Sequence, residues 1–230
     1  MSQGQVFRAL NGAACAGDWV VAAAGSPPGD LLKLWEVPPG ACAHLEFGFS
    51  CMGHELPAGI GIRLAQPDAG EVVVVIGDGT FLLSPTELVT AVQERAKVTV
   101  IVLVNGGYQS IHSLQLSTVG SSFGNEFRVR DRALGAPDGE VVKVDYAAIA
   151  RGLGCEAWRV ETLAELEDAL ARARASEGPA LIECHVEPRR MLLTSGAWWD
   201  LGVAKQSDDA QTLELAAAHA QGAAGQRYHG

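Results

Sequence analysis

Two apolar runs, each ending in a polar, glycine-rich turn, decide the fold: VVVVIGDGT at residues 72–80 and VTVIVLVNGGY at residues 98–108. Their length and their β-branched content predict buried strands. A segment with helical periodicity at residues 85–95 separates them, so the strands are expected to be parallel and joined by a crossover helix. The carboxyl ends of both strands, and the turns that follow them, are then expected at one edge of a sheet.

The same alternation of strand and helix patterns runs along the whole chain. It predicts an α/β fold with a doubly wound, mainly parallel sheet and helices on both faces. Further strands are expected at residues 19–24, 155–160 and 180–185, and further helices at residues 52–65, 145–153, 163–175 and about 209–221. Ser84 to Glu87 and Thr162 to Glu165 have the spacing of capping boxes at helix starts. Residues 25–29 and 117–139 are expected to be loops.

One large domain over residues 1–195 is the simplest division of the 230-residue chain. Residues 196–230 are expected to form a mainly helical tail that packs on this domain or on a partner. The tail contains Trp198 and Trp199, which we interpret as core anchors in preference to cofactor contacts.

Composition excludes several classes of function. A net charge of −10 without a basic patch argues against nucleic acid or an anionic membrane as a partner. No apolar run approaches the roughly 20 residues of a membrane span. The five cysteines are scattered without a C-x-x-C pair, which is typical of reduced thiols. With no secretion signal at the N-terminus, the chain is expected to be cytoplasmic.

The polar residues after the two central strands suit a hard cation. Asp78 supplies a carboxylate, Asn105 an amide oxygen and the Asn105-Gly106-Gly107 turn a carbonyl oxygen. Mg²⁺ takes such oxygen ligands and usually keeps substrate or cofactor phosphates among them. The glycines let the backbone approach a diphosphate closely.

This spacing resembles the diphosphate-binding domain of thiamine diphosphate (ThDP) enzymes. The resemblance implies that Asp78, Asn105 and the Gly107 carbonyl hold Mg²⁺. It extends to the segment from Gly48 to Ala58, in which Met52 stands where the family places the bulky residue that bends the cofactor. The cofactor contacts implied in this way are Gly25, Ser26, Ser50, Met52, Gly77, Gly79, Thr80 and Tyr108, and residues on the substrate side are Ser110, Ile111 and Leu114.

Several stretches are similar to one branch of the family, the trihydroxycyclohexane-1,2-dione hydrolases, in their C-terminal part. These stretches are residues 23–35, 44–53, 123–128 and 197–200. The branch opens a cyclic α-diketone by ThDP-dependent C–C cleavage. The resemblance therefore implies chemistry at a C–C bond next to a carbonyl group, in a 2-oxo acid or an α-diketone.

ThDP enzymes pair this domain with a pyrimidine-binding domain, which carries a glutamate that activates the cofactor. No residue of this chain is assigned that role. Because the chain opens almost directly into the diphosphate-binding domain, we expect a natural split subunit with a separate partner chain, in preference to a fragment of a hydrolase. The chain is expected to assemble as a homo- or hetero-oligomer and to be inactive alone.

Three more residues, and the chain as a whole, have alternative interpretations. Glu87 is interpreted as a capping residue in preference to an acid–base group. His54 and His112 are candidates for the substrate side. A histidine near a helix start, however, is more often a surface group or a hydrogen-bonded one. A non-catalytic assembly module is the alternative for the whole chain. A nicotinamide nucleotide domain is disfavoured, because no G-x-G-x-x-G follows the first strand.

Overall fold

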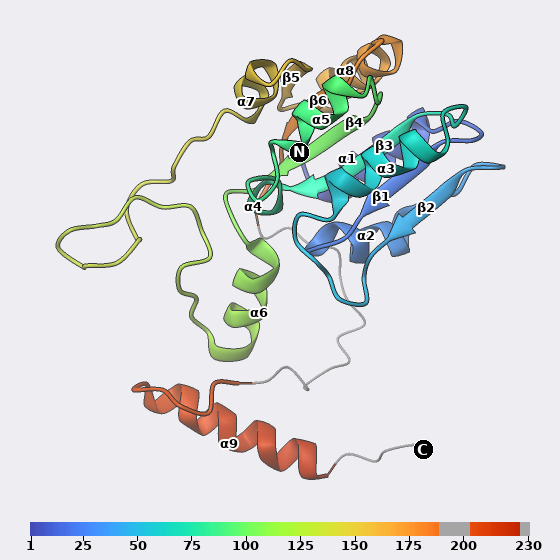
Figure 1. The fold of residues 1–230 in the computed structure, drawn as a ribbon. Helices are drawn as coiled ribbons and strands as arrows, with labels where there is room; N and C mark the ends of the chain where they lie inside the picture. Colours follow the sequence, from blue (N-terminus) through green and yellow to red (C-terminus); the bar gives the residue numbers. More distant parts are fainter. Residues whose placement is uncertain (189–202, 226–230) are drawn as a thin grey trace.

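A six-stranded parallel sheet forms the centre of the molecule (Figure 1). The computed structural model of the chain describes residues 1–188 and 203–225. Across the sheet the strands lie in the order β2-β1-β3-β4-β6-β5. Their bounds are β1 Trp19–Ala22, β2 Cys42–Leu45, β3 Val72–Gly77, β4 Thr99–Val104, β5 Glu156–Val160 and β6 Ala180–His185. The predicted parallel α/β fold is confirmed, and the two runs that predicted it are the neighbouring central strands β3 and β4.

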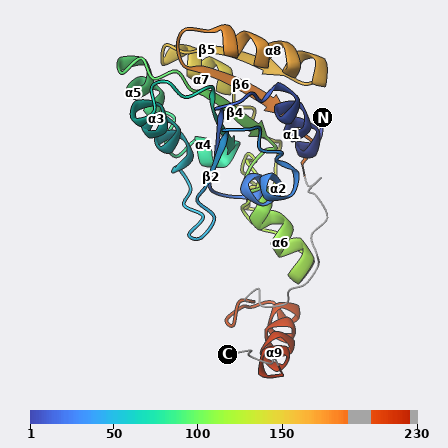
Figure 2. The same cartoon turned by 90° about the vertical axis from the view of Figure 1, so that its right-hand side faces the viewer.

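Helices cover both faces of the sheet, as Figure 2 shows most clearly. The helices α1 Gln3–Ala13, α2 Ser26–Leu34 and α8 Leu163–Ala175 pack on one face, and α3 Glu55–Ala65, α5 Glu87–Gln93 and α7 Tyr146–Gly152 on the other. Neighbouring strand residues divide between the two cores: Val75 packs with the first set of helices and Val74 with the second. This alternation explains why the central strands are apolar throughout.

The remaining helices lie at the carboxyl edge of the sheet or beyond it. The short helix α4 Asp78–Phe81 follows β3, and α6 Gln109–Val119 follows β4. The alanine-rich segment of the tail forms α9 Ala210–Ala224, which contacts α6 and lies away from the sheet in both views (Figures 1 and 2). Trp198 and Trp199 lie outside the described residues, and the proposed boundary near residue 195 remains a prediction.

The expected loop at residues 25–29 is wrong, because α2 begins at Ser26 with Pro27 and Pro28 in its first turn. Proline is tolerated there, since the first N–H groups of a helix have no partner within the helix. The loop expected from residue 117 begins later, after α6 ends at Val119. The helix expected from Met52 starts at Glu55.

The two predicted capping boxes differ in outcome. Thr162 accepts from the Glu165 N–H, and Glu165 in turn accepts from the Thr162 N–H, so this box is confirmed. The box at Ser84 is absent, because the Ser84 hydroxyl donates to the Gly53 carbonyl instead and α5 starts at Glu87. Glu87 accepts from the Thr90 hydroxyl, a contact within its own helix.

Besides α2, the sequence analysis did not predict the short helix α4 or the elements α1, β2 and α6. Strand β2 is only four residues long and includes His44, and α6 buries only Gln109 and His112, so neither has a clear apolar pattern. Helix α1 had a usable signal, because Ser2 and Gln5 form a capping box at its start.

Close packing of α3 on β3 gives a first prediction. A Cβ at Gly59 would lie 2.3 Å from Cγ2 of Val74, whereas a Cβ at Gly61, on the exposed side of the same helix, would meet nothing within 4 Å. We expect Gly59→Ala to lower the free energy of unfolding by about 1–3 kcal/mol through overpacking. Gly61→Ala is the matched control and should raise it by up to about 1 kcal/mol. Urea unfolding measures both, and equal effects would contradict the packing seen here.

Candidate functional site

The carboxyl ends of β1, β3 and β4 open into one cavity of about 500 Å³. Almost every residue predicted for the cofactor or the substrate side lines it. These residues are Gly25, Ser26, Ser50, Met52, Gly77, Gly79, Thr80, Asn105, Gly107, Tyr108, Ser110, Ile111 and Leu114. A larger cavity of about 770 Å³ lies between α1 and α8 and shares no lining residue with this one. The smaller cavity is therefore the candidate site because polar groups gather at it, whereas volume alone would favour the larger one.

Asp78 lies beneath the cavity wall, fully buried. Its Oδ2 accepts from the backbone N–H groups of Asn105 (3.1 Å) and Gly106 (2.7 Å), and its Oδ1 accepts from that of Gly79 (2.8 Å). These bonds tie the turn after β3 to the turn after β4. Burial raises the pKa of Asp78 from 3.8 to about 6, although the same N–H groups oppose the rise. A cation at this carboxylate would favour its ionised form.

Three groups converge here: the Asp78 carboxylate, the Asn105 side-chain amide and the Gly107 carbonyl. One terminal atom of the Asn105 amide lies 3.0 Å from the Gly107 carbonyl oxygen and 3.2 Å from Asp78 Oδ1. An amide nitrogen in this position donates to both oxygens, and a half-turn of the amide brings its own oxygen to the same place. Oxygens about 2.9 Å apart are adjacent ligands in an Mg²⁺ octahedron with bonds near 2.0–2.1 Å. The residues present therefore fit a magnesium ion.

The turn after β4 needs glycine for two reasons. Gly107 has a φ of 143°, and a Cβ there would lie 2.3 Å from the Asn125 carbonyl oxygen. Residues 125–127 pair with this turn: the Tyr108 N–H donates to Asn125 and the Phe127 N–H to Gly106. The Gly107 carbonyl is held in place by this pairing.

An aromatic ring closes one side of the cavity. The ring of Tyr108 lies over Gly79, where a Cβ would come within 2.7 Å of it, and packs edge-on against Phe127. Gly79 therefore allows the backbone after β3 to approach both the ring and whatever occupies the cavity.

The loop of residues 46–53 contributes Phe47, Ser50 and Met52 to the cavity lining, and we name it the Met52 loop. Glu46 accepts from the N–H groups of Phe49 (3.0 Å) and Cys51 (2.8 Å) and so braces the loop from inside. Ser50, which lines the cavity, has a φ of 52°, a conformation that few residues other than glycine adopt. Such strain often accompanies a functional site.

Comparison with known proteins decides the family. Residues 23–184 match the family model described as the thiamine pyrophosphate enzyme C-terminal TPP binding domain. The chain belongs to the thiamine pyrophosphate enzyme family. Thiamine pyrophosphate is another name for ThDP, so the resemblance seen in the sequence is confirmed.

Two relatives of this ThDP domain are bacterial 3D-(3,5/4)-trihydroxycyclohexane-1,2-dione hydrolases. The chain is 40% identical over 188 residues to the protein from Geobacillus thermodenitrificans and 42% identical over 190 residues to that from Halalkalibacterium halodurans. Each match covers 82% of this chain but only 29% of the relative. A ThDP-dependent 4-hydroxybenzoylformate decarboxylase from Rhodococcus jostii has the same fold, with a TM-score of 0.69 and 24% identity over 81% of this chain and 33% of that one.

Three other candidates, His54, His112 and Glu87, are absent from the described lining of this cavity. His54 lies instead against His44, and His112 is buried with its Nδ1 2.7 Å from the Ser122 hydroxyl.

Two glutamines in the lining were missed by the sequence reading. Gln3 accepts from the Ser26 hydroxyl and donates to Asp30, and Gln109 donates to the Asn105 carbonyl. No motif marks Gln3, because it comes from α1, far from the strand ends in sequence. The buried Gln109 Oε1 has no hydrogen-bond partner in the described structure and is free to accept from a bound group.

The raised pKa of Asp78 gives a second prediction. A metal ion binds the ionised carboxylate, so protons compete with it near and below pH 6. We expect the affinity for Mn²⁺, a paramagnetic substitute for Mg²⁺, to fall about tenfold per pH unit below pH 6 and to level off above about pH 7. Titration of the ThDP-free protein by electron paramagnetic resonance measures this. An affinity that stays constant from pH 7 to pH 5 would exclude Asp78 as the ligand that titrates.

The same shift has a consequence for stability in the metal-free chain. The pKa of Asp78 in the folded chain lies above its ordinary value of 3.8, so the folded chain holds this proton more tightly than the unfolded chain. The contribution of Asp78 to folding is therefore favourable at low pH and is lost as the pH rises through about 6.

Proposed function

We propose that this chain is the ThDP- and Mg²⁺-binding half of an enzyme that makes or breaks a C–C bond next to a carbonyl group, with a 2-oxo acid or an α-diketone as substrate. The observation that carries the proposal is the convergence of Asp78, Asn105 and the Gly107 carbonyl at a cavity whose lining also includes Phe47, Ser50 and Met52 of the Met52 loop. A site that combines this donor set with apolar side chains suits a cofactor with a diphosphate and a ring.

Each part of the chain has a distinct task in this account. Asp78, Asn105 and Gly107 would hold Mg²⁺ against the diphosphate, and Gly25, Ser26, Gly77, Gly79 and Thr80 would present their backbone to it. The Ser50 and Met52 segment would hold the aminopyrimidine. When bound, ThDP supplies an electron sink for bond cleavage next to a carbonyl. Ser110, Ile111 and Leu114, on α6, would face the substrate.

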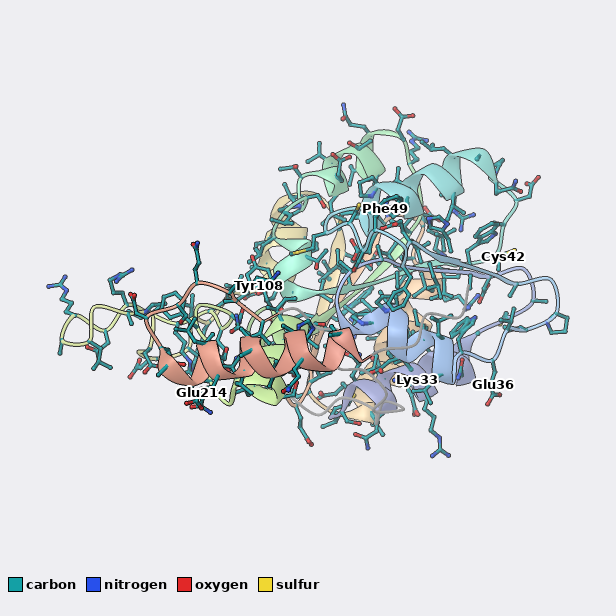
Figure 3. All side chains as sticks on the ribbon, turned by 90° about the horizontal axis from the view of Figure 1, so that it is seen from below. Lys33, Glu36, Cys42, Phe49, Tyr108 and Glu214 are labelled. Atoms are coloured by element: carbon teal, nitrogen blue, oxygen red, sulfur yellow. The ribbon has the colours of Figure 1, made fainter. Side chains whose placement is uncertain are left out.

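The second half of the site is proposed to come from another chain. None of the described residues that line the cavity is acidic, so the activating glutamate is assigned to a pyrimidine-binding partner. Phe47 and Met52, which line the cavity, are exposed, and so is Phe49 of the same loop, at 90%. Phe49 and Tyr108 are labelled in the view from below (Figure 3). An exposed apolar rim of this kind is typical of a surface that a partner covers.

The chain spans about 29% of the length of these two relatives. We propose a homo- or hetero-oligomeric assembly. We also propose a cytoplasmic location, because all five cysteines are free thiols. No helix in the described ranges is long and apolar enough to cross a membrane.

Complementation tests the proposal. This chain would be mixed with the part of the Geobacillus thermodenitrificans hydrolase that it does not match, together with ThDP, Mg²⁺ and a cyclic 1,2-diketone. We expect ring opening in the mixture and none with either chain alone. Turnover by this chain alone would contradict the need for a partner. ThDP binding without turnover in any mixture would favour the non-catalytic assembly module.

A further inference from the structure

A buried carboxyl group stands behind the Met52 loop without a role in holding the metal. Glu55, in the first turn of α3, is 0% exposed. Its Oε1 accepts from the Ala24 N–H at 2.9 Å, and its Oε2 has no hydrogen-bond partner in the described structure. Burial raises the pKa of this carboxyl, so the protonated acid is favoured. A buried polar group of this kind is costly and calls for an explanation.

The contacts of Glu55 join two parts of the cavity wall. Ala24 comes directly before Gly25 and lines the cavity itself, at the carboxyl end of β1. The backbone N–H of Gly53, directly after Met52, also faces the Glu55 carboxyl and opposes part of the rise in its pKa. Glu55 therefore lies between the end of β1 and the end of the Met52 loop.

A pair of histidines closes the base of the same loop. His44 lies in β2 and His54 directly before α3, and their Nε2 atoms are 2.9 Å apart. At this distance one ring donates a hydrogen bond and the other accepts it. Because His44 precedes the Met52 loop and His54 follows it, this bond joins the two ends of the loop.

These contacts hold a strained segment. Within the loop, Ser50 keeps a positive φ, and Glu46 accepts from two N–H groups on either side of it. The side chains of Phe49 and Met52 are exposed and contribute little packing that would hold the loop in place. Polar contacts at the base of the loop are therefore its main restraint.

We propose that His54 and Glu55 are positioning residues that fix the Met52 loop: His54 by its bond to His44, and Glu55 by joining the loop to the end of β1. Neither residue lines the cavity: Glu55 acts through the backbone of Ala24, which does line it, and His54 acts through His44 on the loop that supplies Phe47, Ser50 and Met52. The inference rests on the proposed function, since it concerns the wall that would meet the aminopyrimidine.

Hydrogen exchange and ligand binding together test the proposal. His54→Leu removes the ring nitrogen, and His54→Gln keeps a polar group of similar reach. Glu55→Leu and Glu55→Gln form the second pair, and His219→Leu in α9 is the control. Exchange of the amides of residues 46–53 would be measured without ligand. Dissociation constants for ThDP and for inorganic pyrophosphate would be measured at saturating Mg²⁺.

We expect both leucine variants to speed exchange in the Met52 loop about tenfold and to weaken ThDP binding about tenfold, the effect of losing one hydrogen bond. For His54→Leu, binding of pyrophosphate should stay within about twofold of wild type, because pyrophosphate lacks the aminopyrimidine that the Met52 loop is proposed to hold. The glutamine variants should restore most of the ThDP affinity.

Unchanged exchange in His54→Leu and Glu55→Leu would overturn the positioning roles. An equal loss of ThDP and pyrophosphate affinity in His54→Leu would also overturn them, because it would indicate general damage to the fold. Faster exchange with no ThDP binding by the wild-type chain would leave the restraint of the loop standing and overturn the proposed function instead.

Discussion

Asp78→Asn is expected to weaken Mg²⁺-dependent ThDP binding by more than about 100-fold. Loss of a partner that only orients a metal ligand typically costs about 10–100-fold, so loss of the charged ligand itself should exceed that range. Asparagine keeps an oxygen that can accept from the Asn105 and Gly106 N–H groups, so the two turns should stay connected. The measurement is calorimetric titration of ThDP at fixed Mg²⁺.

The matched control for this change is Asp168→Asn, on the exposed side of α8, where the carboxylate pairs with Arg172. It removes the same charge from the chain far from the cavity and should leave ThDP binding unchanged. Thermal unfolding gives a second readout, because ligand binding stabilises only the folded state. Wild type should be stabilised by Mg²⁺ and ThDP together, and Asp78→Asn should not. Equal stabilisation of both would contradict the assignment of Asp78.

Gly107→Ala is expected to lower the free energy of unfolding by about 3 kcal/mol or more, through a positive φ combined with a steric clash. The new Cβ would lie 2.3 Å from the Asn125 carbonyl oxygen and 2.9 Å from the Glu126 Cα. Both neighbours are backbone atoms, which cannot rotate away. The turn would have to separate from residues 125–127, and the Gly107 carbonyl would move with it, so Mg²⁺-dependent ThDP binding should be lost as well.

Gly106→Ala is the matched control one residue away. Gly106 also has a positive φ, of 84°, but a Cβ there would meet nothing within 4 Å. We expect a cost of only about 1 kcal/mol from the backbone conformation. Urea unfolding of the two variants gives the difference directly. Equal losses would show that the clash with Asn125 does not matter.

The sequence predicted the parts of this molecule that simple patterns encode. The runs at residues 72–80 and 98–108 are β3 and β4, and their turns meet at one edge as expected. The strands are buried on both faces, so an unbroken apolar run was a sufficient signal. The predicted residues lie around one cavity, while their individual roles stay predictions.

Other features depend on contacts between distant parts of the chain. Gln3 reaches the cavity from α1, and the bond between His44 and His54 joins β2 to the start of α3. No local pattern marks either contact. At Ser84 a local pattern is present but misleading. The residue has the signature of a helix cap, but its hydroxyl donates to the Gly53 carbonyl in another segment. Tertiary contacts decided these positions over local preference.

The cavity brings together the oxygens of Asn105 and Gly107, close backbone turns and part of the braced Met52 loop. The exposed apolar side chains of Phe47, Phe49 and Met52 mark the surface where we propose that the activating glutamate arrives. A reaction can be assigned only to the complete assembly, whereas cofactor binding can be tested on this chain.

Calorimetric titration of ThDP into the wild-type chain, with Mg²⁺ and with EDTA in its place, tests the central claim most directly. We expect binding that saturates at one ThDP per chain when Mg²⁺ is present and that is lost in EDTA. Binding of equal strength without a divalent cation would contradict the metal site at Asp78, Asn105 and Gly107. No binding at millimolar ThDP and Mg²⁺ would contradict the account as a whole.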